Sequence, residues 1–246
     1  MATRKLQLIL RDAGLCSRRD AEEMIREGRV TLNGASVKDP TVLADPEKDH
    51  IKLDGKRVGV PSPKKSYYLF HKPRFVISTM DDPKGRPCLK DFLKGVKGPL
   101  FPVGRLDFDA EGLMILTNDG SFAQKLSHPS HQIPRSYLVK VRGVPDDRAL
   151  SRIRPGMNIG GGERVGNVSW SVVRKQNTTT WINITLQEGK KNELKRIFFR
   201  IGHPTRKIRR TSFGPFTLTG LAPGQVRPMT PAEIAHVVSL LRSKKS

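Results

Sequence analysis

The amino-acid sequence predicts an α+β protein with a small N-terminal α/β unit and a larger domain built on a mixed, mainly antiparallel sheet. Two short helical patterns followed by short strands occupy residues 1–60, and a polar segment rich in Pro, Ser and Lys covers 61–66. Alternating strand patterns, interrupted by a few helices, then dominate the chain. We therefore predict a linker at 61–66, a larger domain over 67–242 and a short basic tail at 243–246.

The charge of the chain predicts a polyanionic partner. The 246 residues include 45 Lys and Arg against 23 Asp and Glu, a formal net charge of +22. No apolar span or basic amphipathic helix indicates a membrane, so nucleic acid is the expected partner. Residues 1–60 hold 12 Lys and Arg and 10 Asp and Glu, so almost the whole excess lies in the larger domain. That domain is therefore expected to bind nucleic acid itself.

Cysteine and histidine usage predicts neither a disulfide framework nor a metal site. Cys16 and Cys88 are far apart, and no Cys or His pair has zinc-ligand spacing. His128 and His131 are three residues apart, but Pro129 prevents a continuous helix and no carboxylate or thiol completes a ligand set. The first residues lack the apolar core of a signal peptide, so we expect a cytoplasmic protein.

The N-terminal unit begins with two helices. Apolar residues recur at helical spacing over 6–13, and Gly14 ends that pattern. Ser17 is expected to cap a second helix, with Asp20 at capping-box distance, and Gly28 ends it. Short strands are expected at residues 29–34 and 51–55.

The larger domain is organised around a loop that presents an acid between buried segments. Apolar residues 100–103 precede Arg105 and Asp107, apolar residues 113–116 follow, and an Asn-Asp-Gly turn closes the unit at 118–120. A carboxylate on a rigidly anchored loop is suited to act as a nucleophile or general base. For the tetrapeptide Gly-Arg-Leu-Asp alone, a charged surface turn is the simpler interpretation.

The remaining elements are predicted from the spacing of apolar residues and from the residues that interrupt helices and strands. Strands are expected at 67–70, 75–78 and 135–141, a polar loop at 81–87, a hairpin at 165–175 and 179–186, and helices before His128, up to Gly202 and from Pro231. Between Lys190 and Arg210 there are nine Lys or Arg and one acid, interleaved with apolar residues. This interleaving favours a folded basic face over a disordered tail.

The string Gly-Arg-Leu-Asp at 104–107, followed by Gly-Leu, an apolar run and Thr-Asn-Asp-Gly, resembles the active-site motif of RNA pseudouridine synthases. The similar branch modifies single sites in bacterial ribosomal RNA. The resemblance implies that Asp107 is the catalytic carboxylate, that Arg105 belongs to the catalytic motif, and that Tyr137 lies against the target base. The family pairs its catalytic Asp with the first Arg of Gln-Val-Arg-Arg, which reads Glu-Leu-Lys-Arg here. Lys195 matches that Arg, but lysine lacks the arginine fork, so Arg196 remains an alternative.

A second resemblance covers the N-terminal unit. The strings Gly-Leu-Cys-Ser-Arg-Arg, Gly-Arg-Val and Leu-Asn-Gly in residues 14–34 resemble the S4 RNA-binding domain, although a helical hairpin with surface arginines would explain the pattern without RNA. The residues implied to face RNA are Ser17, Arg18, Arg19, Arg26, Arg29 and Asn33.

Two further segments match the synthase pattern, Lys72-Pro73 and residues 82–87. One departure is Phe75, which stands where the family commonly has a small residue, often glycine. We expect it to alter local packing without affecting the chemistry. The RNA-binding residues expected in the larger domain are Lys72, Arg86, Lys190, Lys191, Arg206 and Lys207.

The resemblance implies isomerisation of uridine to pseudouridine in ribosomal RNA. The N1–C1′ bond breaks, the uracil rotates and C5 is joined to C1′, so no cofactor is required. The uridine must first be flipped out of its stack. The sequence favours 23S over 16S ribosomal RNA, free or in a pre-ribosomal particle, and implies a monomer with no protein or membrane partner. The alternatives are a non-catalytic S4-domain protein of ribosome assembly, which would not need Asp107, Tyr137 and Lys195 or Arg196, and a nucleoside glycosylase, which would release free base.

Overall fold

The computed structural model describes residues 3–59, 65–96 and 98–243. Most of the linker predicted at 61–66 and of the tail predicted at 243–246 lies outside the described residues. Among the helices that are described, none has the length and apolar character needed to cross a membrane.

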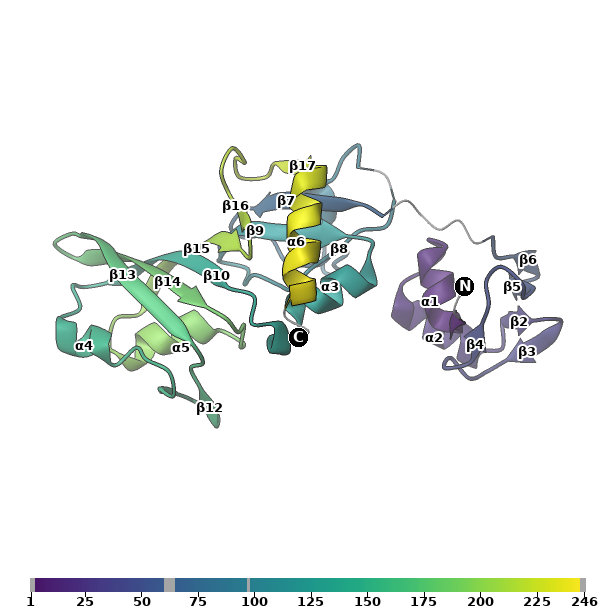
Figure 1. The fold of residues 1–246 in the computed structure, drawn as a ribbon, viewed down its shortest axis with the longest axis horizontal. Coiled ribbons are helices and arrows are strands. Elements are labelled where there is room, and N and C mark those ends of the chain that lie inside the picture. The colour runs from purple at the N-terminus through teal and green to yellow at the C-terminus, as the bar shows by residue number, and fades with distance from the viewer. Residues whose placement is uncertain (1–2, 60–64, 97, 244–246) are drawn as a thin grey trace. The chain divides into compact units, whose positions relative to one another are not determined.

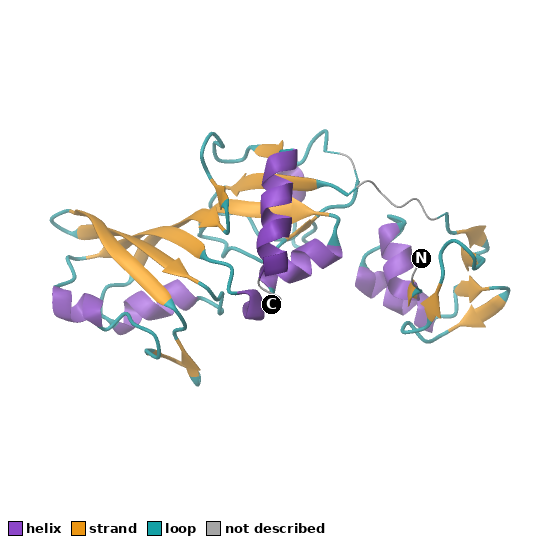
Figure 2. Ribbon diagram, viewed as in Figure 1, coloured by secondary structure: helices purple, strands orange, loops and turns teal. Residues whose placement is uncertain are grey.

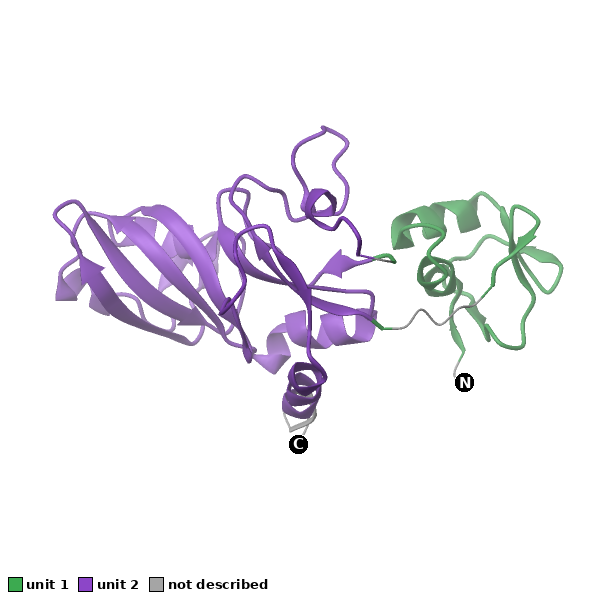
Figure 3. Ribbon diagram, turned by 90° about the horizontal axis from the view of Figure 1, so that it is seen from above, with its two compact units in different colours: residues 1–65, 97–99 green, residues 66–96, 100–246 purple. Residues whose placement is uncertain are grey.

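The chain divides into two compact units, residues 1–65 with 97–99 and residues 66–96 with 100–246 (Figure 3). The first unit pairs two helices with small antiparallel sheets. Its elements are β1 (Arg4–Lys5), α1 (Leu6–Asp12), α2 (Arg18–Arg26), β2 (Val30–Leu32), β3 (Ala35–Val37), β4 (Leu43–Ala44), β5 (Ile51–Leu53) and β6 (Lys56–Arg57). The strand order is β3-β2-β5-β6, and β1 pairs with β4. The predicted capping box is confirmed, because Ser17 and Asp20 each accept a hydrogen bond from the other's backbone N–H.

The second unit contains one long sheet with the strand order β13-β14-β10-β15-β9-β7-β17 (Figure 1). These strands, with β8 beside β9 and β16 beside β15, are β7 (Tyr67–Lys72), β8 (Phe101–Pro102), β9 (Glu111–Thr117), β10 (Arg135–Arg142), β13 (Val168–Lys175), β14 (Thr179–Leu186), β15 (Thr205–Phe213), β16 (Phe216–Thr217) and β17 (Val226–Pro228). Only β9 and β15 pair in parallel among the strands in the described residues. The alternating patterns therefore correctly predicted a mixed, mainly antiparallel sheet.

Helices and short turns cover this sheet. They are η1 (Leu89–Phe92), α3 (Gly120–Ser127), η2 (Pro129–His131), α4 (Asp147–Ser151), α5 (Glu193–Arg200) and α6 (Pro231–Ser243), and β11 (Asn158–Gly160) with β12 (Glu163–Arg164) forms a separate hairpin. α3 and α6 lie against the β7–β9 end of the sheet, and α4 and α5 lie against its β13–β14 end (Figure 2). The Asn-Asp-Gly turn starts a helix, because Asp119 caps α3 by accepting from the N–H groups of Ser121 and Phe122.

β9 is buried along its whole length and anchors the loop that precedes it. Leu113 and Ile115 pack in the core beneath α3 and α6, whereas Met114 and Leu116 pack in the core shared with α5. This alternation follows the two-residue period of a strand that is covered on both faces. Each such buried side chain contributes roughly 1.5–3 kcal/mol, so the end of the Asp107 loop is firmly fixed.

The parallel ladder between β9 and β15 is short and depends on a glycine. Its paired residues are Glu111 with Arg209 and Gly112 with Arg210. Gly112 has φ +123°, and a Cβ there would lie 2.3 Å from the carbonyl oxygen of Arg210 and 2.5 Å from its nitrogen. Only glycine allows the two backbones to approach this closely.

The strand predicted at 75–78 is wrong. Phe75 has φ +61°, a left-handed conformation that interrupts an extended strand, and only an isolated bridge joins Ile77 to Cys88. The Phe75 N–H donates to the Phe108 carbonyl of the Asp107 loop at 2.6 Å, and the Ile77 N–H donates to the Pro87 carbonyl at 2.9 Å. Tertiary hydrogen bonding has replaced the sheet pairing that the apolar residues suggested.

Candidate active site

The Asp107 loop, residues 104–110, is held by the segment that follows β7. The Ser78 hydroxyl donates to the Leu106 carbonyl at 2.6 Å and accepts from the Leu106 N–H at 3.0 Å. Within the loop, the Ala110 N–H donates to the Asp107 carbonyl at 3.1 Å. The Asp107 backbone is therefore fixed, while its side chain remains 41% exposed to solvent. A fixed backbone with an accessible carboxylate is the arrangement expected of a reactive acid.

Lys72 lies beneath this loop, and the expectation that it contacts RNA is wrong. Its side chain is fully buried. Its Nζ donates to the carbonyl oxygens of Pro73 at 3.0 Å, Asp107 at 3.1 Å and Ala110 at 2.8 Å. Burial lowers the pKa of Lys72 to about 8, although Asp109 and Asp107 oppose the shift. Lys72 thus supports the loop backbone instead of reaching a surface phosphate.

Lys195 is the cation that the structure places beside Asp107. Its Nζ, at the start of α5, is 3.5 Å from Asp107 Oδ2 and donates to Asp109 Oδ1 at 2.6 Å. Arg196 instead contacts the β11–β12 hairpin, where its Nε donates to the Ile159 carbonyl at 2.9 Å and its guanidinium pairs with Glu163. Lys195 and Arg196 contact different parts of the molecule because neighbouring side chains on a helix point about 100° apart.

Asp109 is a member of the site that sequence reasoning missed. Burial raises its pKa, but the hydrogen bond and the charge of Lys195, together with a backbone hydrogen bond and the charge of Arg74, outweigh burial, and the pKa of Asp109 is lowered overall. Burial lowers the pKa of Lys195, whereas its bonds to Asp109 and Asp107 raise it more strongly. Both groups therefore stay charged at neutral pH. The Asp-Phe-Asp spacing was the available signal, since it puts two acids on one short loop.

A cavity opens beside these groups and brings several predicted residues together. Tyr137, from β10, is buried in its wall. The charged residues lining the cavity are Arg105, Asp107, Lys190, Glu193 and Lys195, and its apolar residues are Leu106, Ala110, Leu186, Leu194 and Ile208. Such a cavity suits a flat, partly polar ring beside one reactive carboxylate. In the described residues, no group of three or more His, Cys, Asp or Glu is placed to hold a metal ion.

Glu193 is a second acid that the sequence did not single out for function. Its side chain is buried, and burial raises its pKa. Its Oε2 accepts a hydrogen bond from the Lys190 N–H at 3.0 Å, which fixes the turn before α5. This turn orients the start of the helix that carries Lys195.

The other cations expected to bind RNA in this unit fall into two sets. Arg86 pairs with Asp82 at 2.9 Å, Lys207 with Glu111 at 3.2 Å, and Lys190 with Glu188. Lys191 and Arg206 are exposed and form no ion pair within the described part of the chain. Lys191 and Arg206 therefore present the freest charge to a phosphate.

In the first unit, Ser17 and Asn33 support the backbone. Ser17 caps α2, and Asn33, at φ +51°, donates to Asp49 at 2.9 Å and accepts from the His50 N–H at 2.8 Å. The sequence pattern located both residues without revealing these structural roles.

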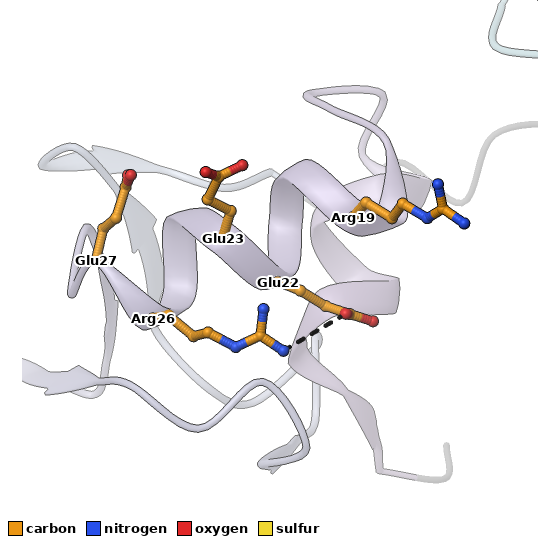
Figure 4. Close-up of a pocket in the computed structure, with 5 residues that line it drawn as sticks. All are labelled: Arg19, Glu22, Glu23, Arg26 and Glu27. Atoms are coloured by element: carbon orange, nitrogen blue, oxygen red, sulfur yellow. Dashed lines mark ion pairs between the residues drawn. The ribbon is translucent and has the colours of Figure 1, made fainter.

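The arginines of the first unit that were expected to face RNA are exposed but interleaved with acids. Arg18 and Arg26 both contact Glu22, at 3.1 and 3.8 Å, and Arg29 pairs with Asp54 at 2.7 Å. Arg26 extends toward Glu22, whereas Arg19 extends away from it and forms no ion pair among the described residues (Figure 4). Most of these guanidinium groups would exchange an internal partner for phosphate on binding RNA.

Comparison with known proteins identifies the class of protein to which this fold and site belong. Residues 66–199 match the RNA pseudouridylate synthase family, and residues 4–49 match the S4 domain. Since the first match covers more than half of the chain, the protein belongs to the RNA pseudouridine synthase family. It is accordingly an isomerase acting on RNA, and the non-catalytic alternative is not supported.

Individual relatives extend over nearly the full chain. The chain is 37% identical over 237 residues to the ribosomal large subunit pseudouridine synthase B of Bacillus subtilis, covering 96% of both chains. It is 40% identical over 238 residues to an uncharacterized RNA pseudouridine synthase of Mycobacterium tuberculosis, covering 95% of this chain and 92% of the relative. A crystal structure of a pseudouridylate synthase superposes with a TM-score of 0.64 at 26% identity, covering 95% of this chain and 99% of that one. These matches confirm the predicted fold class.

Proposed function

We propose that this protein converts a specific uridine of large-subunit (23S) ribosomal RNA to pseudouridine, with Asp107 as the catalytic carboxylate. The observation that carries the proposal is the Asp107 carboxylate, which is 3.5 Å from Lys195 Nζ in a cavity also lined by Tyr137. The choice of the large subunit rests on the relative of Bacillus subtilis, which bears that activity in its name. We further propose a cytoplasmic monomer acting on free RNA or on an assembling subunit.

The reaction needs a carboxylate and no redox partner. The N1–C1′ bond breaks, the C5–C1′ bond forms, C5 loses a proton and N1 gains one, so the product is an isomer. Asp107 serves either as a nucleophile or as the base that removes a proton. Lys195 stabilises its negative charge, and the Tyr137 ring packs against the uracil. Arg105, exposed at the cavity rim, faces the RNA from which the uridine is flipped.

RNA contacts outside the cavity come from exposed cations of both units. In the first unit these are Arg18, Arg19, Arg26 and Arg29 on or next to α2, with Ser17 and Asn33 shaping the surface. In the second unit Lys191 and Arg206 contact phosphates directly, while Arg86, Lys190 and Lys207 do so by exchanging their carboxylate partners.

The test of the catalytic assignment is Asp107→Asn, which keeps the size of the side chain and removes its charge. The variant should release no tritium from ribosomal RNA transcripts labelled with 5-tritiated uridine, and its RNA affinity should stay within about threefold of wild type. Assays of 23S and 16S transcripts side by side show which of the two RNAs contains the target uridine. Turnover by Asp107→Asn at the wild-type rate would refute the role of Asp107.

The partner of Asp107 is tested by a matched pair of variants on α5. Lys195→Ala should lower the single-turnover rate about a hundredfold, or about 3 kcal/mol of transition-state stabilisation. Arg196→Ala, which loosens the β11–β12 hairpin instead, should react within a few-fold of wild type. The reverse result would assign the ion pair to Arg196.

A further inference from the structure

Two phenylalanines are exposed beside the Asp107 carboxylate. Phe108 directly follows Asp107 and is 45% exposed, and Phe75 is 53% exposed. Their ring centroids are 5.6 Å apart at an interplanar angle of 60°. Phenylalanine is normally among the most buried residues. Two contacting rings that are exposed to water next to a reactive group therefore indicate a binding surface.

The backbone of Phe75 holds its ring at this position at a cost. Its φ of +61° lies in the left-handed region, which is unfavourable for a residue with a side chain. The hydrogen bond from its N–H to the Phe108 carbonyl, at 2.6 Å, fixes both residues to the same loop. Strained conformations of this kind concentrate at functional sites.

A cation borders the rings. The Arg74 guanidinium carbon lies 4.8 Å from the Phe75 ring centroid, and Arg74 Nε donates to the Asp109 carbonyl at 3.1 Å. Lys195 Nζ donates to the side chain of the same Asp109, to Oδ1 at 2.6 Å. Aromatic faces flanked by Arg or Lys are how proteins bind unpaired nucleotides, because the ring stacks on a base while the cation meets the phosphate.

We propose that Phe75 and Phe108 form a stacking platform for an unpaired RNA base next to the uridine being isomerised. The proposal rests on the proposed function for the role of Asp107. Two rings are far smaller than a stable protein interface, and the surrounding charge is positive, so an RNA base fits better than a protein partner. Phe199, on α5, is even more exposed, at 73%, but has no aromatic neighbour among the described residues.

The platform would supply part of the energy of base flipping. Extruding a uridine leaves its former neighbour unstacked, which costs free energy. A protein ring that stacks on that neighbour recovers part of the cost at the moment when the uridine enters the cavity. The platform residues therefore position the RNA and take no part in bond making.

The experiment compares Phe108→Ala, Phe108→Leu, Phe108→Trp and Phe75→Gly with wild type, and uses Phe199→Ala as the matched control. Affinity is measured by filter binding to 23S and 16S transcripts, and rate by single-turnover tritium release on the transcript that wild type modifies. Phe108→Ala and Phe75→Gly should bind roughly 5- to 100-fold more weakly. Because the platform acts in RNA binding and base flipping and not in bond making, their rates at saturating RNA should fall by a smaller factor than their affinities. Phe108→Trp should retain affinity, and Phe108→Leu should not.

Phe75→Gly separates binding from folding. Glycine accepts a φ of +61° without strain, so the variant should melt at or above the wild-type temperature while binding RNA more weakly. Wild-type affinity in Phe108→Ala and Phe75→Gly, or in Phe108→Leu, would overturn the stacking platform. An equal loss in Phe199→Ala would overturn it too. If wild type releases no tritium from either transcript, the proposed function fails, and filter binding of the same variants still decides the platform.

Discussion

At the scale of single residues, the most informative group of the site is a buried lysine. The Lys72 ammonium donates to three carbonyl oxygens, two of them in the Asp107 loop. A neutral side chain of the same length would remove this donor from all three carbonyls, although the Asp107 carbonyl would keep the Ala110 N–H. An unpaired buried carbonyl costs about 1–3 kcal/mol. Lys72 therefore fixes the loop, but the protein pays a desolvation cost for keeping its charge.

That cost predicts a pH dependence of stability. The pKa of Lys72, about 8, lies below its ordinary value of 10.5, so the folded protein holds this proton less tightly than the unfolded chain does. The cost is fully present below pH 8 and disappears as the pH rises to 10.5. Relative to Lys72→Met, wild type should therefore gain about 2–3 kcal/mol of unfolding free energy between pH 7 and 10.5.

Urea unfolding at several pH values measures this gain. Lys125→Met is the control, because Lys125 is exposed on α3. Parallel stability curves for wild type and Lys72→Met would contradict the buried ammonium.

The sequence indicated only part of the site. Asp107 and Lys195 could be predicted because a linear motif carries each of them, and Tyr137 because it stands in a recognisable strand. Lys72 could not be placed, since Lys followed by Pro is usual on surfaces and its burial depends on a loop 35 residues away. Asp109 was missed because only the approach of α5 makes it a partner of Lys195.

At the scale of secondary-structure elements, the two halves of the long sheet meet through a single short ladder. β9 and β15 pair at only two positions, and Gly112 is one of them. Glu111, at the other position, pairs with Lys207 and Arg209 of β15. The Asp107 loop ends where this ladder begins, so the ladder sets the position of the loop against β15.

Gly112→Ala should therefore destabilise the second unit by about 2–5 kcal/mol, from the collision of Cβ with Arg210 and from the left-handed strain. Gly220→Ala is the matched control. Gly220 has φ +71°, but a Cβ added there would have no atom within 4 Å, so only the strain term of about 1–2 kcal/mol applies. Thermal melts of both variants measure the difference between their losses of stability. Equal losses would show that the strands can separate to accept a methyl group.

Elements that are defined by local signals were predicted well. The capping box of α2, the β13–β14 hairpin and the start of α6 at Pro231 all depend on residues close in sequence. The segment at 75–78 was predicted incorrectly, because Phe75 and Ser78 bond to the Asp107 loop and Ile77 bonds to Pro87, all of them distant in sequence or outside a regular strand. The parallel pairing of β9 with β15 could not be predicted either, because nothing in the sequence of one strand specifies the other strand as its partner.

At the scale of the whole molecule, charge and hydrophobic packing are distributed differently between the units. Each unit has hydrophobic core clusters of its own, so each has the packing needed to fold alone. The net charge is +2 in residues 1–60 and +20 in 61–246, so the unit with the active site also carries most of the attraction for RNA.

A chain of residues 66–246 should therefore fold and retain RNA binding with reduced affinity. If Arg18, Arg19 and Arg26 contact phosphates, their loss should lower the slope of log affinity against log salt by about 2. Arg18→Ala with Arg26→Ala in the full chain should reproduce most of this change. Filter binding at salt concentrations from about 50 to about 300 mM, with circular dichroism to verify folding, measures both. An unchanged slope would mean that the first unit recognises RNA without neutralising phosphates.

The short β9–β15 ladder also bears on the order of events during synthesis of the protein. Glu111 and Arg209 are separated by 98 positions in the chain, and Lys195 follows Asp107 at a similar interval. Contacts between such distant segments close large loops and form late. As the chain leaves the ribosome, the first unit and the Asp107 loop emerge well before α5 and β15. We therefore expect the nascent protein to assemble its active site only when synthesis is nearly complete.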